Sequence, residues 1–417
     1  MKIGILGGSG VYTPALITEI IKSNGELDVD QIVLNGRSSD KLNIVKNVCR
    51  ELVRRSGLDI KIDTSTNIAD AVKNMDVVIS QVRIGGMQAR AFDENFPPEF
   101  DMVGEETIGP GGLSNAIRTI PAVLEIASEV ERCNKNAFLI MLTNPCSMIL
   151  RAINQAKYNI KAVGICDLPR VLISKIADLL KIGEEELNVE YFGLNHLGWI
   201  KKVYHNGIDL TDNVIDRFDE IDGIIEKDIV QFHKAIPVSH LKYYFHPDRI
   251  LNKPQTRAHE LLSLEEEILG NFKSGNLEQG LNLLNRRSTV WYKYIIDFIK
   301  TIYGDKQTFH ILNVKNDGIM NFLPTDSVVE TGCMVRRGEI RSLPAKDIPL
   351  SIQSLITQIN TYEELAVQGI LQNSRALLIE ALMVHPFIRS YDQAEAVLNK
   401  IIKGNIEMGF LREEQIN

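Results

Sequence analysis

The chain has 417 residues, of which 44% are hydrophobic and 24% are charged, an ordinary composition for a globular protein whose length predicts two domains. Its 46 Lys and Arg residues and 54 Asp and Glu residues give a net charge of −8 without a long basic run, which argues against nucleic acid or an anionic membrane as the main partner. No apolar run approaches the roughly 20 residues that span a bilayer, and because Lys2 leads directly into an apolar strand we expect no signal peptide. Five scattered cysteines without a CxxC pair favour a reduced, cytoplasmic protein.

The first half of the chain alternates between short apolar runs and amphipathic segments, as βαβ units do. The apolar runs predict buried parallel strands at Ile3–Leu6, Gln31–Leu34, Asp76–Ser80, Ala137–Leu142 and Ala162–Ile165. Helical spacing predicts helices at Ala15–Lys22, Asp40–Arg54 and Leu113–Val130. Thr13 followed by Pro14 predicts an N-cap, and Gly109–Gly112 predicts the start of a long helix. The fold class is therefore α/β, with an N-terminal Rossmann-like, doubly wound parallel sheet.

After about residue 166 this alternation fades. Paired strands are expected within Tyr191–Tyr204, ending in a turn at His205-Asn206-Gly207. Further helices are predicted at Asp212–Ile236, Leu261–Leu284, Trp291–Ile302 and Leu350–Ile402, and further strands at Phe309–Asn313 and Ser327–Val335. We therefore expect a dinucleotide-binding domain over residues 1–165 and a C-terminal α+β domain, rich in helices, over residues 166–417. Without a linker between them, the two halves should pack tightly around a cleft.

A glycine-rich turn follows the first predicted strand. It consists of Gly7, Gly8, Ser9 and Gly10. Its backbone N–H groups could hold the pyrophosphate of a dinucleotide, although the third glycine of the GxGxxG pattern is missing. The alternative is a tight strand–helix turn of the kind found in any α/β protein.

The second predicted strand ends in an unusual sequence for a dinucleotide fold. Such folds place Asp or Glu here to bind the ribose 2′-hydroxyl, whereas this chain has Asn35. The Asn35 side chain can still bond the ribose, and Arg37 with Ser38 could accept a 2′-phosphate. The pattern therefore predicts NAD without excluding NADP, and a solvated turn is a close alternative.

Two side chains of the metal-ligand type lie at predicted strand-to-loop junctions. Cys166 follows the strand that ends at Ile165, and His196 follows Phe192–Asn195. Thiolate and imidazole suit a borderline divalent metal, with substrate oxygens in the remaining positions. On spacing alone, a small buried hydrophobe and a hydrogen-bonded structural histidine are the stronger readings.

Several polar residues could bind an anionic group. The candidates are Arg83, Arg90, Asn144 and Arg257. An Arg fork with an Asn amide suits a phosphate, and Asn144 follows a predicted strand. The alternative is that each arginine is a solvated surface residue and that Glu105 and Glu106 form only a charged loop.

Taken together, these motifs resemble those of glycoside hydrolase family 4, in the family's order and over nearly the whole chain. They are Gly7-Gly8-Ser9, Tyr12-Thr13-Pro14, Gln81–Arg90, Gly104–Gly112, Thr143-Asn144-Pro145, Gly164–Pro169, Phe192–Trp199, Asn313–Gly318 and Val328–Cys333. The Tyr243-Tyr244-Phe245 segment looks most like the 6-phospho-β-glucosidase branch. The family is NAD-dependent and an exception to the two-carboxylate glycosidase scheme.

The resemblance implies hydrolysis of 6-phosphoglycosides by a redox-neutral elimination and addition. In this scheme NAD takes a hydride from C3, a divalent metal (typically Mn²⁺) stabilises the enolate, and a base removes the C2 proton. The implied metal ligands are Cys166 and His196. The implied cofactor contacts are Gly7, Gly8, Ser9, Gly10, Asn35, Arg37 and Asn144. The implied substrate contacts are Arg90, Glu106, Asn144 and Arg257.

The chain departs from the family pattern at two positions. His240 stands where the family has its tyrosine base, within Pro237–Tyr244. Histidine can itself act as a base, and Tyr243 or Tyr244 could substitute for it. The second departure is Asp167, a candidate acid, where the resemblance implies Asn in the β-branch and Asp in the α-branch. The resemblance thus implies His240, Asp167 and Tyr243 as catalytic candidates.

The sequence leaves three other functions open. They are a 6-phospho-α-glucosidase of the same family, an NAD(P)-dependent hydroxyacid dehydrogenase, and a non-catalytic paralogue that binds nucleotide and phosphosugar. The expected partner is a phosphorylated disaccharide or an aryl 6-phosphoglycoside, and the expected assembly is a homodimer or homotetramer.

Overall fold

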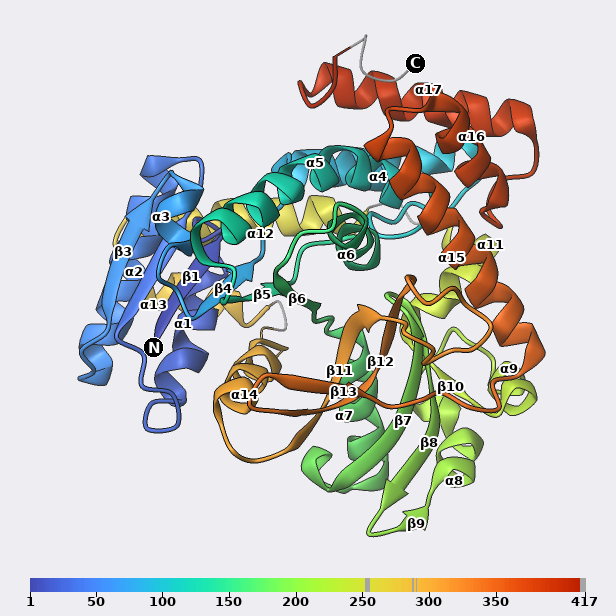
Figure 1. Cartoon of the computed structure of the whole chain (residues 1–417), viewed down its shortest axis with the longest axis horizontal. Helices are drawn as coiled ribbons and strands as arrows, with labels where there is room; N and C mark the ends of the chain where they lie inside the picture. Colours follow the sequence, from blue (N-terminus) through green and yellow to red (C-terminus); the bar gives the residue numbers. More distant parts are fainter. Residues whose placement is uncertain (252–255, 287–288, 290, 413–417) are drawn as a thin grey trace.

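Thirteen strands of the described residues form one mixed sheet that runs through the molecule (Figure 1). The computed structural model describes residues 1–251, 256–286, 289 and 291–412. The strand order is β10-β8-β7-β12-β11-β6-β5-β4-β1-β2-β3, with β13 beside β12 and β9 beside β8. The strands are β1 (Lys2–Leu6), β2 (Gln31–Asn35), β3 (Lys61–Ser65), β4 (Val77–Ser80), β5 (Phe138–Met141), β6 (Lys161–Gly164), β7 (Leu187–Leu194), β8 (Leu197–His205), β9 (Ile208–Asp209), β10 (Ile236–Pro237), β11 (Thr308–Lys315), β12 (Val328–Arg336) and β13 (Glu339–Ser342).

Strands β1 to β6 make the parallel part of the sheet, in the order β3-β2-β1-β4-β5-β6. This is the strand order of a doubly wound dinucleotide fold, so the predicted Rossmann-like sheet is confirmed. All five predicted strands are present. The sequence pattern does not predict strand β3, because only Ile62 of its five residues is buried and no apolar run marks the strand.

Helices cover both faces of the sheet. They are α1 (Thr13–Lys22), α2 (Ser39–Ser56), α3 (Ile68–Val72), α4 (Gly86–Asn95), α5 (Gly109–Asn134), α6 (Cys146–Gln155), α7 (Leu168–Leu180), α8 (Thr211–Asp216), α9 (Lys227–His233), α10 (Lys242–Phe245), α11 (Pro247–Ile250), α12 (Arg257–Lys273), α13 (Leu277–Leu284), α14 (Trp291–Tyr303), α15 (Leu350–Leu371), α16 (Arg375–Val384) and α17 (Tyr391–Glu407). Among the described residues, no helix combines the length and the apolar character needed to cross a membrane.

Two apolar cores fill the space between the sheet and these helices. Successive residues of a strand point to opposite faces, so Val78 of β4 joins one core while Val77 and Ile79 join the other. Leu139 and Ile140 of β5 divide in the same way. Burial on both faces explains why these strands read as continuous apolar runs.

The C-terminal half continues the sheet in antiparallel fashion. Strand β11 meets β6 at a single pair, Asn313 opposite Gly164, and β12, β7, β8 and β10 follow. The prediction of a helix-rich α+β half is confirmed, while the division at residue 165 stays a prediction.

The mostly helical segment predicted over Asp212–Ile236 is correct only in part, because it is not one continuous helix. Short helices α8 and α9 lie there, followed by strand β10. The Asp222 carboxylate accepts hydrogen bonds from the backbone N–H groups of Ile224 and Ile225, at 2.8 and 3.1 Å. Such a turn competes with helical hydrogen bonding, which interrupts the helix.

Buried His310 on β11 should make the fold sensitive to acid. Burial, with a smaller effect of Arg170, lowers its pKa to about 3, whereas an unfolded histidine has a pKa of about 6.5. Between these values only the unfolded chain binds the proton, so His310 lowers the free energy of unfolding by up to about 1.4 kcal/mol per pH unit of acidification. Urea denaturation at pH 6.5 and pH 5 should show a shallower pH dependence for His310→Gln than for the parent chain. Equal slopes would contradict this assignment.

Candidate functional site

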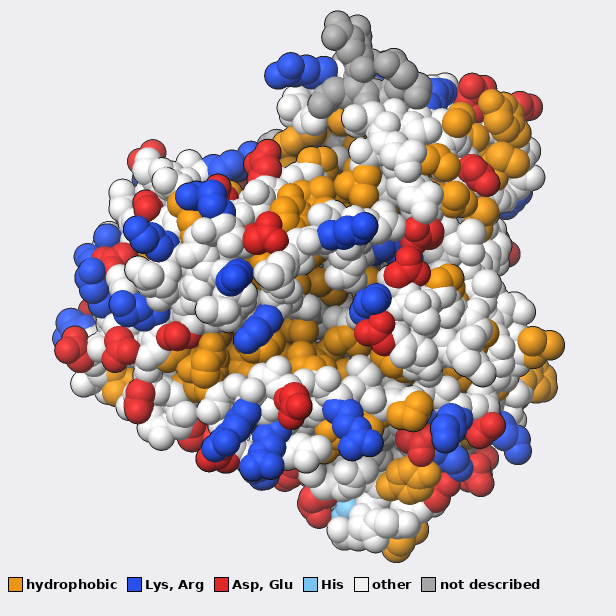
Figure 2. Space-filling model, in the orientation of Figure 1, with side chains coloured by type: hydrophobic (Ala, Val, Ile, Leu, Met, Phe, Trp, Pro, Cys, Tyr) orange, Lys and Arg blue, Asp and Glu red, His pale blue; other side chains and the backbone are white. Residues whose placement is uncertain are grey.

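The carboxyl ends of the parallel strands collect most of the predicted site residues at one edge of the sheet. The glycine-rich turn follows β1, Arg83 follows β4, Asn144 follows β5, and Cys166 follows β6. Ligands bind at this edge in open α/β sheets. Figure 2 shows a hollow with hydrophobic side chains across the middle of this face of the molecule.

The glycine-rich turn fits tightly against the neighbouring strands. Gly7 has φ +80°, and a Cβ there would lie 2.8 Å from the carbonyl oxygen of Gln81, so only glycine is accommodated. The Gly8 N–H donates to the Asn35 carbonyl at 2.7 Å. The predicted Thr13 N-cap is wrong: Tyr12 precedes the helix without a side-chain cap, and the Thr13 hydroxyl accepts from the Gln81 amide at 3.0 Å.

His196 and His240 meet with their ring centroids 4.7 Å apart. His196 lies in the two-residue loop between β7 and β8 with φ +63°, and its Nδ1 is 2.7 Å from the Thr107 hydroxyl. His240 lies just before α10, and its ring centroid is 5.2 Å from that of Tyr243. The fold therefore brings His196, the predicted metal ligand, into contact with His240, the predicted base, and with Thr107 from a third segment of the chain.

Both histidines are neutral at pH 7. Burial, and next the charge of His240, lower the pKa of His196 to about 3. Burial, and next the charge of Lys242, lower the pKa of His240 to about 3. The buried Nδ1 of His240 has no hydrogen-bond partner among the described residues. A buried nitrogen without a partner is costly, which suggests that a ligand group completes the site.

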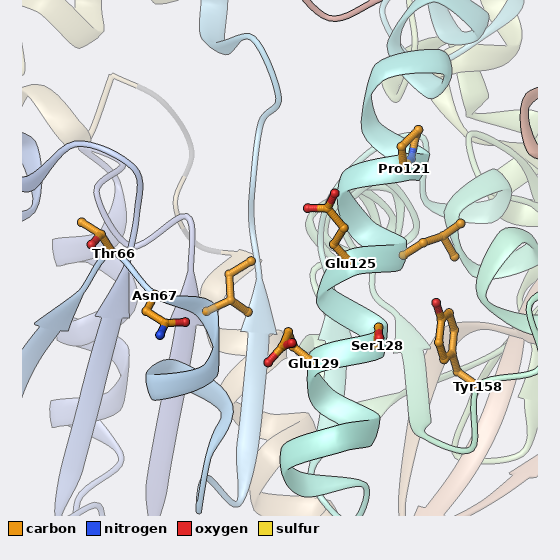
Figure 3. Close-up of a pocket in the computed structure, with 9 residues that line it drawn as sticks. Thr66, Asn67, Pro121, Glu125, Ser128, Glu129 and Tyr158 are labelled. Atoms are coloured by element: carbon orange, nitrogen blue, oxygen red, sulfur yellow. The ribbon is translucent and has the colours of Figure 1, made fainter. Parts of the chain in front are cut away.

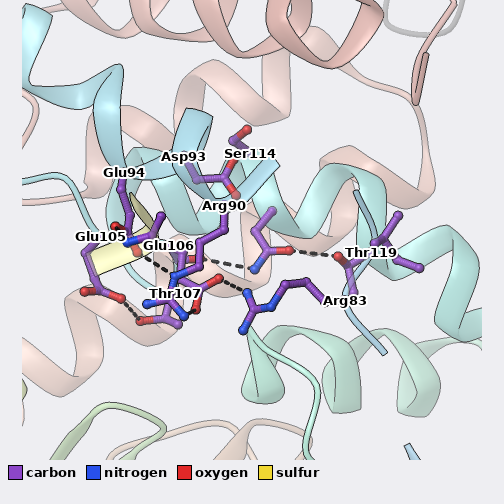
Figure 4. A network of polar contacts seen from close by, with 12 residues as sticks. Arg83, Arg90, Asp93, Glu94, Glu105, Glu106, Thr107, Ser114 and Thr119 are labelled. Carbon is purple, nitrogen blue, oxygen red and sulfur yellow. Dashed lines mark hydrogen bonds and ion pairs between the residues drawn. The ribbon is translucent and has the colours of Figure 1, made fainter. Parts of the chain in front are cut away.

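Figure 4 shows a buried ion-pair network. The charges of its members Glu106 and Arg90 act on His196. Arg90 contacts Glu94 at 2.6 Å and Glu106 at 2.9 Å, and Arg83 also pairs with Glu106. Glu94 further accepts the backbone N–H of Ala258, the second residue of α12, at 2.8 Å. Arg90 is only 8% exposed, so an anionic ligand there would have to share this arginine with two carboxylates.

Glu105 connects this network to Tyr243. It accepts a hydrogen bond from the Thr107 hydroxyl at 3.0 Å and another from Tyr243. Burial, and next the Glu105 charge, raise the pKa of the Tyr243 hydroxyl far above its usual value. Tyr243 is therefore held in its protonated form, whereas neutral His240 has a ring nitrogen without a partner.

Cys166 lies at the end of β6 beside Asp167 and Glu330. Its Sγ is 3.8 Å from an Asp167 carboxylate oxygen, and burial, with the Glu330 charge next, raises the pKa of the thiol well above its usual value. The Asp167 charge also acts on His196, where it partly opposes the lowering of the His196 pKa.

Glu330 is a residue of this site that the sequence did not single out. It is 1% exposed and accepts hydrogen bonds from the Tyr191 hydroxyl at 2.6 Å, the Asn313 amide at 2.9 Å and the Asn195 amide at 3.2 Å. Its signal was a carboxylate in the apolar strand Val328–Cys333. Through Asn195 it fixes the loop that carries His196.

The donor set of Cys166 and His196 fits a divalent metal in part. The hydrogen bond at Nδ1 leaves Nε2 of His196 for a ligand, and a neutral imidazole is the form that binds metal. In the part of the chain that the structure describes, no cluster of three or more His, Cys, Asp or Glu side chains could hold a metal. A metal bound by these two residues would therefore take its other ligands from substrate or water.

Three predicted contacts lie apart from these networks. Arg257, the first residue of α12, is exposed and pairs with Glu260. Arg37 is exposed after β2. Asn144, half-buried, follows β5 but enters none of the side-chain hydrogen bonds described above. All three assignments stay predictions.

An open groove of about 640 Å³ lies elsewhere, between α3 and α5 (Figure 3). It is lined by Thr66, Asn67, Ile68, Pro121, Leu124, Glu125, Ser128, Glu129 and Tyr158. None of the predicted site residues lines it, so the groove belongs to a different surface.

A fully buried pair, Arg118 and Asp93, holds α4 to α5 behind the site. Arg118→Met would leave the Asp93 carboxylate buried without its partner, which lowers the free energy of unfolding by about 3–5 kcal/mol. Chemical denaturation measures this loss. The double variant with Asp93→Leu should recover most of it, and an equal loss in both variants would contradict the pairing.

Family models and curated relatives match almost the whole chain. A model for "Family 4 glycosyl hydrolase" matches residues 2–182, and one for its C-terminal domain matches residues 191–388. A probable 6-phospho-beta-glucosidase of Bacillus subtilis is 29% identical, over 97% of this chain and 96% of the relative. A 6-phospho-beta-glucosidase of Thermotoga maritima is also 29% identical, over 98% and 99%. A maltose-6′-phosphate glucosidase of Clostridium acetobutylicum is 26% identical, over 97% of each.

The fold is likewise similar to those of solved structures. The Thermotoga maritima 6-phospho-beta glucosidase with manganese, NAD⁺ and glucose-6-phosphate superposes with a TM-score of 0.90 at 27% identity, covering 98% of this chain and 99% of the other. A malate dehydrogenase of Plasmodium falciparum reaches a TM-score of 0.54 at 15% identity, covering 89% and 99%, and shares the fold alone.

Proposed function

Because this chain belongs to family 4 of the glycosyl hydrolases, we propose that it is a glycosidase that hydrolyses 6-phospho-β-glucosides. Relatives that carry this name cover nearly all of the chain. In the structure of the Thermotoga maritima relative, manganese, NAD⁺ and glucose-6-phosphate occur together. We extend this set to the present chain as a nicotinamide dinucleotide, a divalent metal and a phosphosugar substrate.

The observation that carries the proposal is the contact between His196 and His240, 4.7 Å between ring centroids. It joins the proposed metal ligand to a neutral imidazole whose Nδ1 has no partner in the described structure. When bound, the dinucleotide supplies a hydride acceptor and the metal supplies a Lewis acid. His240 would accept the substrate proton at its unpartnered nitrogen, because burial and the Glu105 charge raise the pKa of Tyr243 and keep it protonated.

The remaining residues would bind and orient the substrate. Cys166 and His196 would hold the metal, and Asp167, next to Cys166, would be the candidate acid. Arg90, Glu106, Asn144 and Arg257 would contact the phosphate and sugar, with Gly7–Gly10 at the dinucleotide.

A 6-phospho-α-glucoside is the second candidate substrate. Asp167 favours it, because the family resemblance implies Asp at this position in the α-branch. Relatives named maltose-6′-phosphate glucosidase match the chain over the same length at 26–27% identity. The chemistry proposed for His240 would serve both anomers.

A panel of α- and β-linked 6-phosphoglucosides, assayed with Mn²⁺, NAD⁺ and a thiol reductant, tests the proposal. We expect cleavage of the β-linked substrates, with non-phosphorylated analogues inert, and no NADH accumulation in step with product. Stoichiometric NADH would identify a dehydrogenase instead. Binding without cleavage of any substrate would identify a non-catalytic phosphosugar-binding protein.

We also propose a cytoplasmic location and a homodimeric or homotetrameric assembly, with residues 1–165 as the dinucleotide-binding domain. The scattered cysteines without a CxxC pair support the location. Light scattering of the purified chain would determine its assembly.

A further inference from the structure

The structure places Gly36, the residue before Arg37, directly against the glycine-rich turn. A Cβ on Gly36 would lie 2.7 Å from the Ser9 hydroxyl oxygen and 2.9 Å from the Ser9 Cβ, so the chain before Arg37 packs directly on this turn. The Gly8 N–H bond to the Asn35 carbonyl, 2.7 Å long, fixes the same approach. A dinucleotide bound at the turn would therefore present its adenosine ribose to the end of β2.

The end of β2 has no carboxylate to bind an unmodified ribose. Asn35 is 7% exposed, and its amide nitrogen already donates to the Ser65 carbonyl at 3.0 Å. An Asp or Glu at this position accepts hydrogen bonds from the ribose hydroxyls and repels a 2′-phosphate. Its replacement by a neutral amide removes that repulsion.

Arg37 is exposed and makes no hydrogen bond or ion pair within the described structure. The arginines of the adjacent helix α2 differ, because Arg50 bonds the Ile62 carbonyl and Arg54 pairs with Glu51. Next to Arg37, the Ser38 hydroxyl oxygen accepts the Lys41 N–H at 3.3 Å, which leaves its hydrogen available to donate. A guanidinium fork and a hydroxyl donor are the groups that bind a phosphate monoester.

We propose that Arg37, assisted by Ser38, binds the 2′-phosphate of the dinucleotide, so that this chain prefers NADP(H) to NAD(H). The inference rests on the proposed function, because it requires a dinucleotide at the glycine-rich turn. It makes Arg37 a residue that determines cofactor specificity.

Isothermal titration calorimetry of the full chain in 0.15 M salt, with three adenosine phosphates, tests the inference. Adenosine 2′,5′-bisphosphate should bind at least about tenfold more tightly than 5′-AMP, as one charge-assisted contact implies. It should also bind more tightly than adenosine 3′,5′-bisphosphate, which carries the same charge at the wrong position. Equal binding of the two bisphosphates would overturn the inference, because it would show only general attraction to charge.

Two variants locate the effect. Arg37→Ala should weaken binding of the 2′,5′-bisphosphate about tenfold and change that of 5′-AMP by less than about twofold, whereas Arg336→Ala, which removes another exposed arginine, should change neither. An equal loss for both ligands in Arg37→Ala would overturn the inference.

The controls separate this inference from the proposed function. If NAD⁺ and 5′-AMP bind but the 2′-phosphate adds nothing, only the inference fails. If no adenosine phosphate and neither dinucleotide binds, the dinucleotide site of the proposed function fails, and the inference fails with it.

Discussion

Replacement of His240 by phenylalanine should lower kcat for 6-phosphoglycoside cleavage by about 10²- to 10⁴-fold, the usual contribution of a general base. Phenylalanine keeps the ring that packs near His196 and Tyr243 but removes both nitrogens. KM should change much less, because His240 is assigned to proton transfer and the ion-pair network to binding. Steady-state kinetics on the phosphoglucoside panel, with saturating Mn²⁺ and dinucleotide, measures the two effects separately.

The matched control is His205→Phe, which alters a partly exposed histidine on β8 that pairs with Glu186. It should leave kcat within about twofold of the parent. His240→Tyr restores the residue that the family resemblance implies. If the parent is inactive and His240→Tyr cleaves the substrate, His240 is a substitution that abolishes activity. If His240→Phe retains full kcat, the assignment of His240 as the base is wrong.

The strands of the parallel half could be predicted because each one leaves a signal in its own short stretch of sequence. Strands buried on both faces must be apolar runs, and β1, β4 and β5 all carry that pattern. Strand β3 lies at the edge of the sheet with mostly half-buried residues, so its sequence carries no such signal. The interruption between α8 and α9 depends on one Asp222 turn, which competes with a favourable helical pattern.

The sequence predicts which types of residue form the site, but not most of the contacts between them. The sequence put Cys166 and His196 at strand ends, and strand order then determines that they share an edge. The contacts of the site join residues that are far apart in the sequence. Thr107 and His196 are 89 positions apart, and Glu330 is 135 positions from Asn195 and 139 from Tyr191. No spacing rule covers such pairs, because they arise only after the antiparallel half joins the sheet.

Cys166→Ser should weaken Mn²⁺ binding by at least about 100-fold, the upper range for losing even a supporting residue of a metal site. Activity at limiting Mn²⁺ should fall with it. Burial raises the pKa of the Cys166 thiol, so metal must displace its proton, and Mn²⁺ affinity should rise about tenfold per pH unit while the thiol is protonated. In Cys166→Ser that part of the pH dependence should disappear.

The loss of free Mn²⁺ signal in electron paramagnetic resonance titrations between pH 6 and 8 measures this affinity without requiring turnover. Cys133→Ser makes the same change on α5, where the half-buried Sγ is 3.7 Å from Glu129, and should leave Mn²⁺ affinity unchanged. An unaltered affinity in Cys166→Ser would remove the thiolate from the metal site. The metal would then depend on His196 and substrate oxygens alone, and His196→Ala, assayed in the same way, would decide whether this edge of the sheet binds metal at all.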